Sequence, residues 1–476
     1  METLSEEQRD AKTPKLSGYL RAAVIGLGLV MAALVILHLP GLNGPSFWKW
    51  VWREPRLKVG PLYLAMGVAA LPILAAPRVW RGGAIRRRRI LAVGLLLVGS
   101  FAMRVASLVV RSDPPSLIYI PAIVTDETAT GYYADALAMS LHPLRDWIIL
   151  YPTVMEHLHT HTKIKPPGLV LYWVFFIQTF DRNVGPAVDY YPALYGGLGL
   201  GILAVLGIAA TYCLLGVILE DPDAAFWGAA FLSLCPGFVL FFPTFDPAYI
   251  LLSTALIGFW YQALARDSTK WSILLGVVLG ATLLITFNIL VIGAFMAAMI
   301  FIVPPAARTI GGRLGVAAKH AGTAVGVTLA MLGLFWLAIG YDVIATFQSA
   351  WRNQHMQLAR YADSRPYPMT VPFDLTDFAL GSGWISAALV VCYFLSRWRD
   401  RRHDRLVWTS LAFFALVAVT GLLPGETARV WNFMLPLLMI PVGLELSHWT
   451  MRERTGLLAV LALITITISQ NMLFIY

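Results

Sequence analysis

Residues 90–110 read ILAVGLLLVGSFAMRVASLVV and follow directly on four arginines, Arg86 to Arg89. A helix needs about 20 mostly apolar residues in a row to cross the hydrocarbon core of a bilayer. Residues 90–110 meet that length, and a basic cluster at one end is typical of a cytoplasmic flank. The stretch therefore predicts a membrane-spanning helix whose N-terminal end faces the cytoplasm.

The composition extends this prediction to the whole chain. Of its 476 residues, 58% are hydrophobic and 13% are charged, which is far too apolar for a soluble globular protein. The apolar runs do not alternate apolar and polar residues as barrel strands do, so the predicted fold class is all-α and polytopic. The net charge of +9 fits basic cytoplasmic loops better than a nucleic-acid partner, and we expect no nucleic-acid binding.

Apolar segments recur along the chain and predict about 13 transmembrane helices. We expect residues 1–89 to form a cytoplasmic N-terminus with two additional helices, and residues 90–476 to form the main core. The expected spans are 19–39, 60–77, 90–110, 191–216, 222–241, 247–264, 271–286, 288–304, 320–340, 378–396, 405–423, 430–447 and 456–475.

Basic clusters predict the orientation of the loops. Arg313 with Lys319, the arginines between Arg397 and Arg405, and Arg452 with Arg454 each mark a cytoplasmic loop. The loops 111–166 and 341–377 and the turn 424–429 then lie outside. We expect a multi-pass protein of the cytoplasmic (inner) membrane with its functional site on the outer face.

One part of this topology stays open. The downstream basic clusters require an odd number of crossings between the loop 111–166 and residue 222. Two apolar segments, 167–180 and 191–216, lie in that interval. One of them is re-entrant or interfacial, or a boundary is misplaced, and the sequence does not decide which.

The loop 111–166 holds most of the polar chemistry. A membrane protein seldom gathers carboxylates, imidazoles and a lysine at the bilayer surface unless they handle a polar substrate. The groups concerned are Asp126-Glu127, Tyr132-Tyr133, Asp146-Trp147-Ile148, the alternating His157, His159 and His161, and Lys165-Pro166-Pro167-Gly168.

The order of these motifs resembles the GT-C superfamily of membrane glycosyltransferases, above all the protein O-mannosyltransferases and the lipid A aminoarabinose transferases. Those families carry Asp-Glu at the start of the first external loop and His- or Lys-Pro-Pro at its end, here Asp126-Glu127 and Lys165-Pro166-Pro167. The resemblance implies a GT-C-like core with two extra N-terminal helices. It also implies three kinds of partner: a polyprenyl-phosphate-sugar donor, a lipid, glycan or protein acceptor, and the membrane lipids.

Weaker matches lie downstream. Phe245-Asp246-Pro247 is similar to an Asp-Pro at a helix start of the family. The run from Gly425 to Trp431 is similar to a Gly-Glu-x-x-Arg-x-Trp element of uncharacterised bacterial relatives. The resemblance implies substrate-binding roles for Asp246, Glu426 and Trp431, and for Tyr132 and Tyr133 in the external loop. An N-cap role accounts for Asp246 equally well.

The implied reaction needs a base and a phosphate site. An acceptor hydroxyl or amine attacks the anomeric carbon, the phosphate leaves, and the configuration inverts. Asp126 is the expected base, and Glu127 is expected to bind a metal or to orient the acceptor. Lys165 and Arg429 are expected to bind the donor phosphate through charge-assisted hydrogen bonds. Each assignment has an alternative. Asp126 can be an N-cap residue and Glu127 a solvated side chain. Lys165 and Arg429 can be anchors at the membrane interface.

The alternating histidines suggest a second chemistry. His157, His159 and His161 face one side if the segment is extended, and His157 and His161 share a face if it is helical. His157 and His161 are thus candidate ligands for a divalent metal such as Mg, Mn or Zn, with Asp126 or Glu127 completing the site. His159 is assigned to substrate binding. Ordinary hydrogen bonding in a polar loop is the alternative for all three.

The loop 341–377 is rich in aromatic and polar groups and includes His355. Aromatic faces and hydrogen-bonding tips suit a sugar, so His355 is expected to bind substrate. An interfacial aromatic belt accounts for the Trp and Tyr residues there equally well.

A transporter or flippase of a polar or lipid-linked substrate is the competing class. Transporters tend to place charged residues in mid-bilayer, in broken helices of a repeated fold. Here the charges gather in external loops and no repeat is visible, which favours an enzyme.

Overall fold

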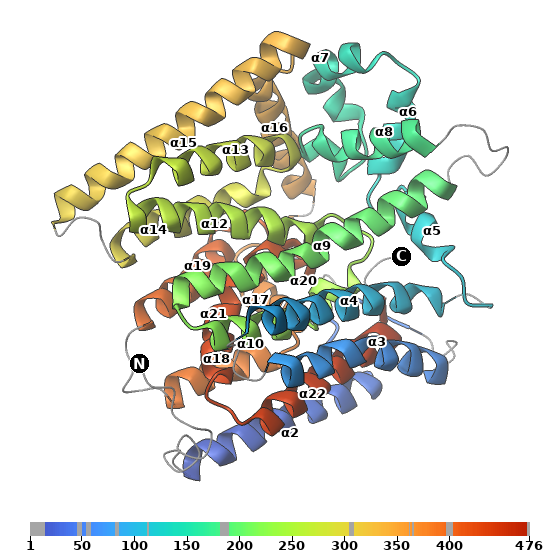
Figure 1. Cartoon of the computed structure of the whole chain (residues 1–476). Helices are drawn as coiled ribbons and strands as arrows, with labels where there is room; N and C mark the ends of the chain where they lie inside the picture. Colours follow the sequence, from blue (N-terminus) through green and yellow to red (C-terminus); the bar gives the residue numbers. More distant parts are fainter. Residues whose placement is uncertain are drawn as a thin grey trace.

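The computed structural model describes residues 15–44, 50–53, 59–80, 85–111, 114–180, 190–303, 309–360, 362–363, 366–396 and 403–473. The fold is all-α, as predicted, and its long helices run roughly side by side (Figure 1). The strands β1 (Val51–Trp52) and β2 (Met472–Leu473) pair antiparallel. This pairing ties the segment that follows the first helix to the C-terminal end of the last one.

Six helices in the described ranges are long and apolar enough to cross a membrane. A bent pair of helices, α17 (Thr370–Gly381) and α18 (Ile385–Ser396), raises the number to seven if it counts as one span. The chain is therefore a multi-pass membrane protein. The six are α2 (Lys15–Ile36), α3 (Val59–Trp80), α4 (Arg86–Val109), α9 (Tyr190–Leu219), α12 (Tyr249–Arg266, with the 3₁₀ turn Asp246–Ala248 before it) and α15 (Ile310–Ile339).

The remaining helices are shorter or more polar. Four of them, α8, α13, α14 and α21, are short apolar helices. Their bounds are α5 (Tyr119–Thr125), α6 (Tyr132–Ser140), α7 (Leu144–Val154), α8 (Gly168–Phe180), α10 (Pro222–Leu232), α11 (Pro236–Leu240), α13 (Thr269–Ile285), α14 (Ile292–Ile302), α16 (Val343–Arg360), α19 (Asp404–Thr420), α20 (Thr427–Val430), α21 (Leu435–Leu446) and α22 (Met451–Asn471).

Two expected spans are interrupted. The segment 222–241 divides into α10 and α11, because Pro236 begins a new helix at its first position. The segment 378–396 contains a bend of 97° between α17 and α18. There Gly383 and Trp384 both have positive φ angles, of 88° and 55°. Glycine adopts such angles without a steric penalty, so the Gly-Ser-Gly run before Trp384 permits the bend.

The centre of the bundle is formed by α10 and α21, which pack against each other. Every residue of α21 is buried, as are all residues of α10 after Asp223. A Cβ at Gly443 would collide with the carbonyl oxygen of Ala224, so the two backbones are in direct contact there. By contrast, only 17% of the most apolar stretch of α15 is buried inside the protein. Its apolar side chains face outward, as in a lipid-exposed helix.

Two ion pairs tie α22 to α2 and to α10 at the end rich in basic residues. Arg21 of α2 donates from Nη1 to Glu453 Oε2 at 3.0 Å. Arg454 of α22 pairs with Asp223 at 2.9 Å, and Trp80 Nε1 donates to the other oxygen of Asp223 at 2.7 Å. Arg454, expected as a cytoplasmic marker, is thus 8% exposed and paired. The expected cluster residues Arg397, Arg399, Arg401 and Arg402 lie outside the described residues.

We predict that Gly443→Ala destabilises the protein by about 1–3 kcal/mol, because the added methyl group forces α10 and α21 apart. The measurement is thermal unfolding in detergent. Gly333→Ala is the matched control, since a Cβ at Gly333 on α15 meets nothing within 4 Å. Equal melting temperatures for the two variants would contradict the close packing of α10 on α21.

Candidate functional site

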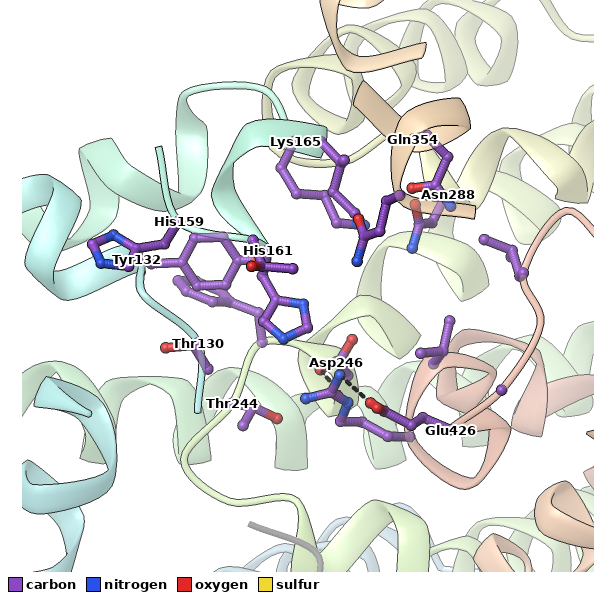
Figure 2. A pocket seen from close by; sticks show the side chains of 18 of the residues that line it. Thr130, Tyr132, His159, His161, Lys165, Thr244, Asp246, Asn288, Gln354 and Glu426 are labelled. Atoms are coloured by element: carbon purple, nitrogen blue, oxygen red, sulfur yellow. Dashed lines mark hydrogen bonds and ion pairs between the residues drawn. The ribbon is translucent and has the colours of Figure 1, made fainter. Parts of the chain in front are cut away.

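A cavity of about 600 Å³ opens where the loop before α6, the segment before α8, the start of α12 and the helices α16 and α20 meet (Figure 2). Charged and neutral hydrogen-bonding side chains alternate around its wall. The lining residues are Glu127, Thr128, Thr130, Tyr132, His159, Thr160, His161, Ile164, Lys165, Thr244, Phe245, Asp246, Tyr249, Asn288, Gln354, Gln357, Leu358, Leu423, Pro424, Gly425, Glu426, Arg429 and Val430.

The cavity brings together most of the residues singled out in the sequence. They come from three separate regions, namely the external loop, the start of α12 and the turn before α20. Those that line the cavity are Glu127, Tyr132, His159, His161, Lys165, Asp246, Glu426 and Arg429.

Asp126 is not among the lining residues. Its Oδ1 accepts hydrogen bonds from the backbone N–H of Thr128 at 2.8 Å and from the Thr128 hydroxyl at 2.6 Å. This local pairing turns the carboxylate back on its own loop, as aspartates in turns commonly do. The next residue, Glu127, reaches the cavity with a side chain that is 66% exposed.

Four other expected residues also lie away from the cavity. Tyr133 is 2% exposed and packs edge-on against Trp173, because it follows Tyr132 on a helix and points to a different face. Trp431 is fully buried, and its indole N–H donates to the carbonyl of Leu423 at 3.0 Å. His157 and His355 are exposed.

The helical period explains the position of His355. Its ring packs on Trp351 one turn earlier, at 4.5 Å between centroids. The cavity face of α16 carries Gln354 and Gln357 instead. The sequence indicated a polar, aromatic loop here but did not indicate which face of the helix meets the substrate.

The predicted metal site is not assembled. His161 lines the cavity, whereas the side chain of His157 is exposed and lies outside its lining. Across the residues that the structure describes, no group of three or more His, Cys, Asp or Glu side chains is placed to hold a metal ion. The donor set therefore does not fit the expected divalent ion, and no chemical step is derived through one.

Arg429 sits in an ion cluster. Its Nη2 donates to Glu426 Oε2 at 2.6 Å, and its Nε lies 3.8 Å from Asp246 Oδ2 (Figure 2). Burial alone would lower the pKa of the Arg429 guanidinium, but the charges of Glu426 and Asp246 outweigh it and raise that pKa. The positive charge of Arg429 is thus permanent and already balanced by two carboxylates.

Lys165 carries the less compensated charge. Its ammonium is buried and donates to the Thr286 hydroxyl at 3.3 Å. Among the described residues, no carboxylate oxygen lies within 4.0 Å of Lys165 Nζ. Burial lowers the pKa of Lys165 to about 8. Its backbone is extended before Pro166, as predicted, with φ −123° and ψ 153°, and its carbonyl accepts from the Tyr151 hydroxyl.

A histidine–carboxylate pair forms the opposite edge of the cavity. Asp135, which the sequence did not single out, is 6% exposed and accepts from His159 Nδ1 at 2.8 Å and from the His159 backbone N–H at 3.2 Å. His159 Nε2 lies 3.4 Å from Glu127 Oε2. Gly131, with φ 71°, leaves room for the ring, because a Cβ there would overlap His159. Asp135 lies in a helix rather than a motif, so only its tertiary partner reveals it.

Two buried aspartates hold the turn that presents Glu426 and Arg429. Asp374 Oδ1 accepts from the Gly425 N–H at 2.7 Å, and Asp377 Oδ2 accepts from the Ala428 N–H at 2.9 Å. Gly425 and Glu426 have positive φ angles of 75° and 51°, a backbone form that costs energy at Glu426. The spacing of Asp374 and Asp377 on one helix face is the only sequence signal for this arrangement.

Comparison with known proteins gives no family: no family model matches the sequence, and no curated protein matches it.

We predict a raised pKa for His159. Burial alone would lower that pKa, but the hydrogen bond and charge of Asp135, and then those of Glu127, raise it above the ordinary value of about 6.5. Asp135→Asn should bring the pKa down. Nuclear magnetic resonance titration of histidine-labelled protein measures it, with His159→Gln to assign the signal. A wild-type value at or below the ordinary one would contradict the pairing.

Proposed function

We propose that this chain is a glycosyltransferase of the GT-C type. It transfers a sugar from a polyprenyl-phosphate donor to an acceptor at the outer face of the cytoplasmic membrane, with inversion. The observation that supports this most is the cavity itself. It combines a buried lysine that has no carboxylate oxygen within 4.0 Å among the described residues, an arginine held by two acids, and neutral hydrogen-bonding groups, all at one end of membrane helices.

The directions of the helices support an outward-facing cavity. Helix α4 begins at the arginines from Arg86 and runs toward α5, next to the cavity loop. Helix α12 follows Asp246 in the cavity wall and ends at Arg266. Helix α15 begins near Arg313 and ends beside Tyr341. Because basic residues mark the cytoplasmic side, the cavity end of each helix is the outer end.

These directions also favour thirteen crossings. The expected spans correspond to α2, α3, α4, α9, α10 with α11, α12, α13, α14, α15, α17 with α18, α19, α21 and α22. Helix α8 has 13 residues and, with α9, is one of the two apolar segments between the external loop and residue 222. It starts beside Lys165 and packs on α6 and α9. We assign α8 to the outer interface, which gives the odd number of crossings that the basic clusters require.

Lys165 is the proposed main ligand of the donor phosphate. Figure 2 places it near Asn288 and Gln354, whose amides can hydrogen-bond sugar hydroxyls. The leaving phosphate needs positive charge rather than a proton, and a buried ammonium with only a hydroxyl partner supplies it. Arg429 contributes less attraction, because Glu426 and Asp246 already neutralise it.

Glu127 replaces Asp126 as the preferred base. The acceptor oxygen bonds to the anomeric carbon as the bond from that carbon to the phosphate oxygen breaks, and its electron pair leaves with the phosphate. The acceptor proton passes to the carboxylate of Glu127, which lines the cavity beside His159. Asp126 shapes the turn that carries Glu127.

A flippase or transporter is the second candidate, and one observation favours it. Discontinuous helices near buried charges are common in transporters, and here α17 and α18 are bent by 97° next to Asp374 and Asp377. Movement of a polyprenyl-phosphate sugar across liposomes by protein that transfers no sugar would support this class over the enzyme.

We predict that Glu127→Gln lowers kcat for sugar transfer by about 10²- to 10⁴-fold, the usual contribution of a general base. Purified protein is incubated with radiolabelled polyprenyl-phosphate sugars and membrane extract, and product is counted. Asp126→Asn is the matched control and should cost less. A larger loss of kcat in Asp126→Asn would restore Asp126 as the base. If neither the folded wild type nor a folded variant transfers sugar, the enzyme proposal is wrong.

We predict that donor binding weakens as the pH rises through about 8, because Lys165 then loses its charge. The phosphodiester of the donor does not titrate in this range, so any change in binding comes from the protein. The donor KM should rise about tenfold between pH 7 and 9.5, which corresponds to the loss of one hydrogen bond to a charged group. Lys165→Arg should abolish the rise, since arginine stays protonated. Lys163→Arg is the control, and a wild-type KM that ignores pH would contradict the role of Lys165.

A further inference from the structure

We propose that Trp50 and Asp377 are positioning residues for the ion cluster of the cavity, so that the segment joining the first two membrane helices belongs to the scaffold of the active site. The sequence had placed this segment in an additional N-terminal region, apart from the core. The kinetic part of this inference rests on the proposed function.

A chain of short hydrogen bonds carries the inference. The indole N–H of Trp50 donates to Asp377 Oδ1 at 2.6 Å. Asp377 Oδ2 accepts from the Ala428 N–H at 2.9 Å and from the Thr427 hydroxyl at 3.3 Å. Ala428 precedes Arg429, whose guanidinium faces the cavity. The carboxylate of Asp377 therefore connects Trp50 to the backbone that positions Arg429.

Burial makes these bonds strong. Trp50 is 7% exposed and Asp377 is 4% exposed. A carboxylate at such a site is costly unless its oxygens are hydrogen-bonded, and here Trp50 serves one oxygen while residues 427–428 serve the other. Loss of the indole donor leaves one oxygen unsatisfied, which weakens the hold of the carboxylate on the Ala428 N–H.

Trp50 also packs against the segment that leads to Asp246, the second carboxylate of the ion cluster. Its ring packs on Phe241 at 5.5 Å between centroids. Phe241 lies in the buried segment that leads to Asp246, the other carboxylate beside Arg429. One side chain from the N-terminal region thus supports both segments whose charges meet in the cavity.

The position of Trp50 is itself fixed. Its backbone N–H donates to the carbonyl of Asn43 at 2.7 Å, and the Asn43 amide donates back to the carbonyl of Trp50 at 2.8 Å. The next two residues, Val51 and Trp52, form the strand β1, which pairs with β2 at the end of α22. These contacts fix the backbone at Trp50 and so orient its indole toward Asp377.

The kinetic test is a double-mutant cycle. Trp50→Phe keeps the ring but removes the N–H, and it should raise the donor KM about threefold, less than loss of the Lys165 charge does, with little change in kcat. In an Arg429→Gln background the same change should have almost no further effect, because the residue being positioned is gone. Trp52→Phe is the matched control, since Trp52 stacks on His38 in the same segment. Equal effects of Trp50→Phe in both backgrounds would overturn the proposal.

A second measurement does not depend on catalysis. Hydrogen exchange at the amides of residues 427–428 should be faster in Trp50→Phe and in Asp377→Asn than in wild type, and unchanged in Trp52→Phe. Unchanged exchange in Trp50→Phe would overturn the positioning inference whatever the transfer assay shows. Faster exchange in a protein whose wild type transfers no sugar would support the inference and contradict the proposed function.

Discussion

Everything at the cavity depends on how two carboxylates are satisfied inside a membrane protein. Asp374 and Asp377 are almost fully buried, where an ionised group without partners is very unfavourable. Their oxygens accept from the backbone of residues 425–428, which in turn fixes a turn with two consecutive left-handed residues. The same hydrogen bonds offset both the cost of burying the carboxylates and the cost of the left-handed turn. The result is a rigid base from which Glu426 and Arg429 project.

The charges of the cavity are arranged unequally. Arg429 is enclosed by Glu426 and Asp246, so it orders the wall as much as it attracts an anion. Lys165 has a hydroxyl partner instead and keeps most of its attraction for a ligand. A site in which one cation is paired with carboxylates and the other is not can bind a phosphate and still release it, whereas two unpaired cations would hold the anion tightly. This balance suits the phosphate that leaves in the proposed sugar transfer.

The sequence predicts the membrane character and the spans that six long helices and one bent pair match, because apolar length is a local property. It also predicts Lys165, Asp246 and Arg429 as neighbours of the cavity, since a family-like motif order carries them. It does not predict Asp135, Asp374 or Asp377, whose roles depend on partners far along the chain. The structure places Tyr133, Trp431 and His355 away from the cavity lining, because the sequence alone does not show which side of the local backbone faces the cavity.

The closing of the bundle by α22 has a consequence for how the protein is made. Arg21 and Asp223 reach their partners Glu453 and Arg454 only when the last helix is present. During synthesis these charges wait in the early helices while most of the chain emerges. Arg21 and Asp223 therefore gain these charged partners only when α22 packs against the helices that precede it in the chain, so the stabilisation from both ion pairs comes late in folding.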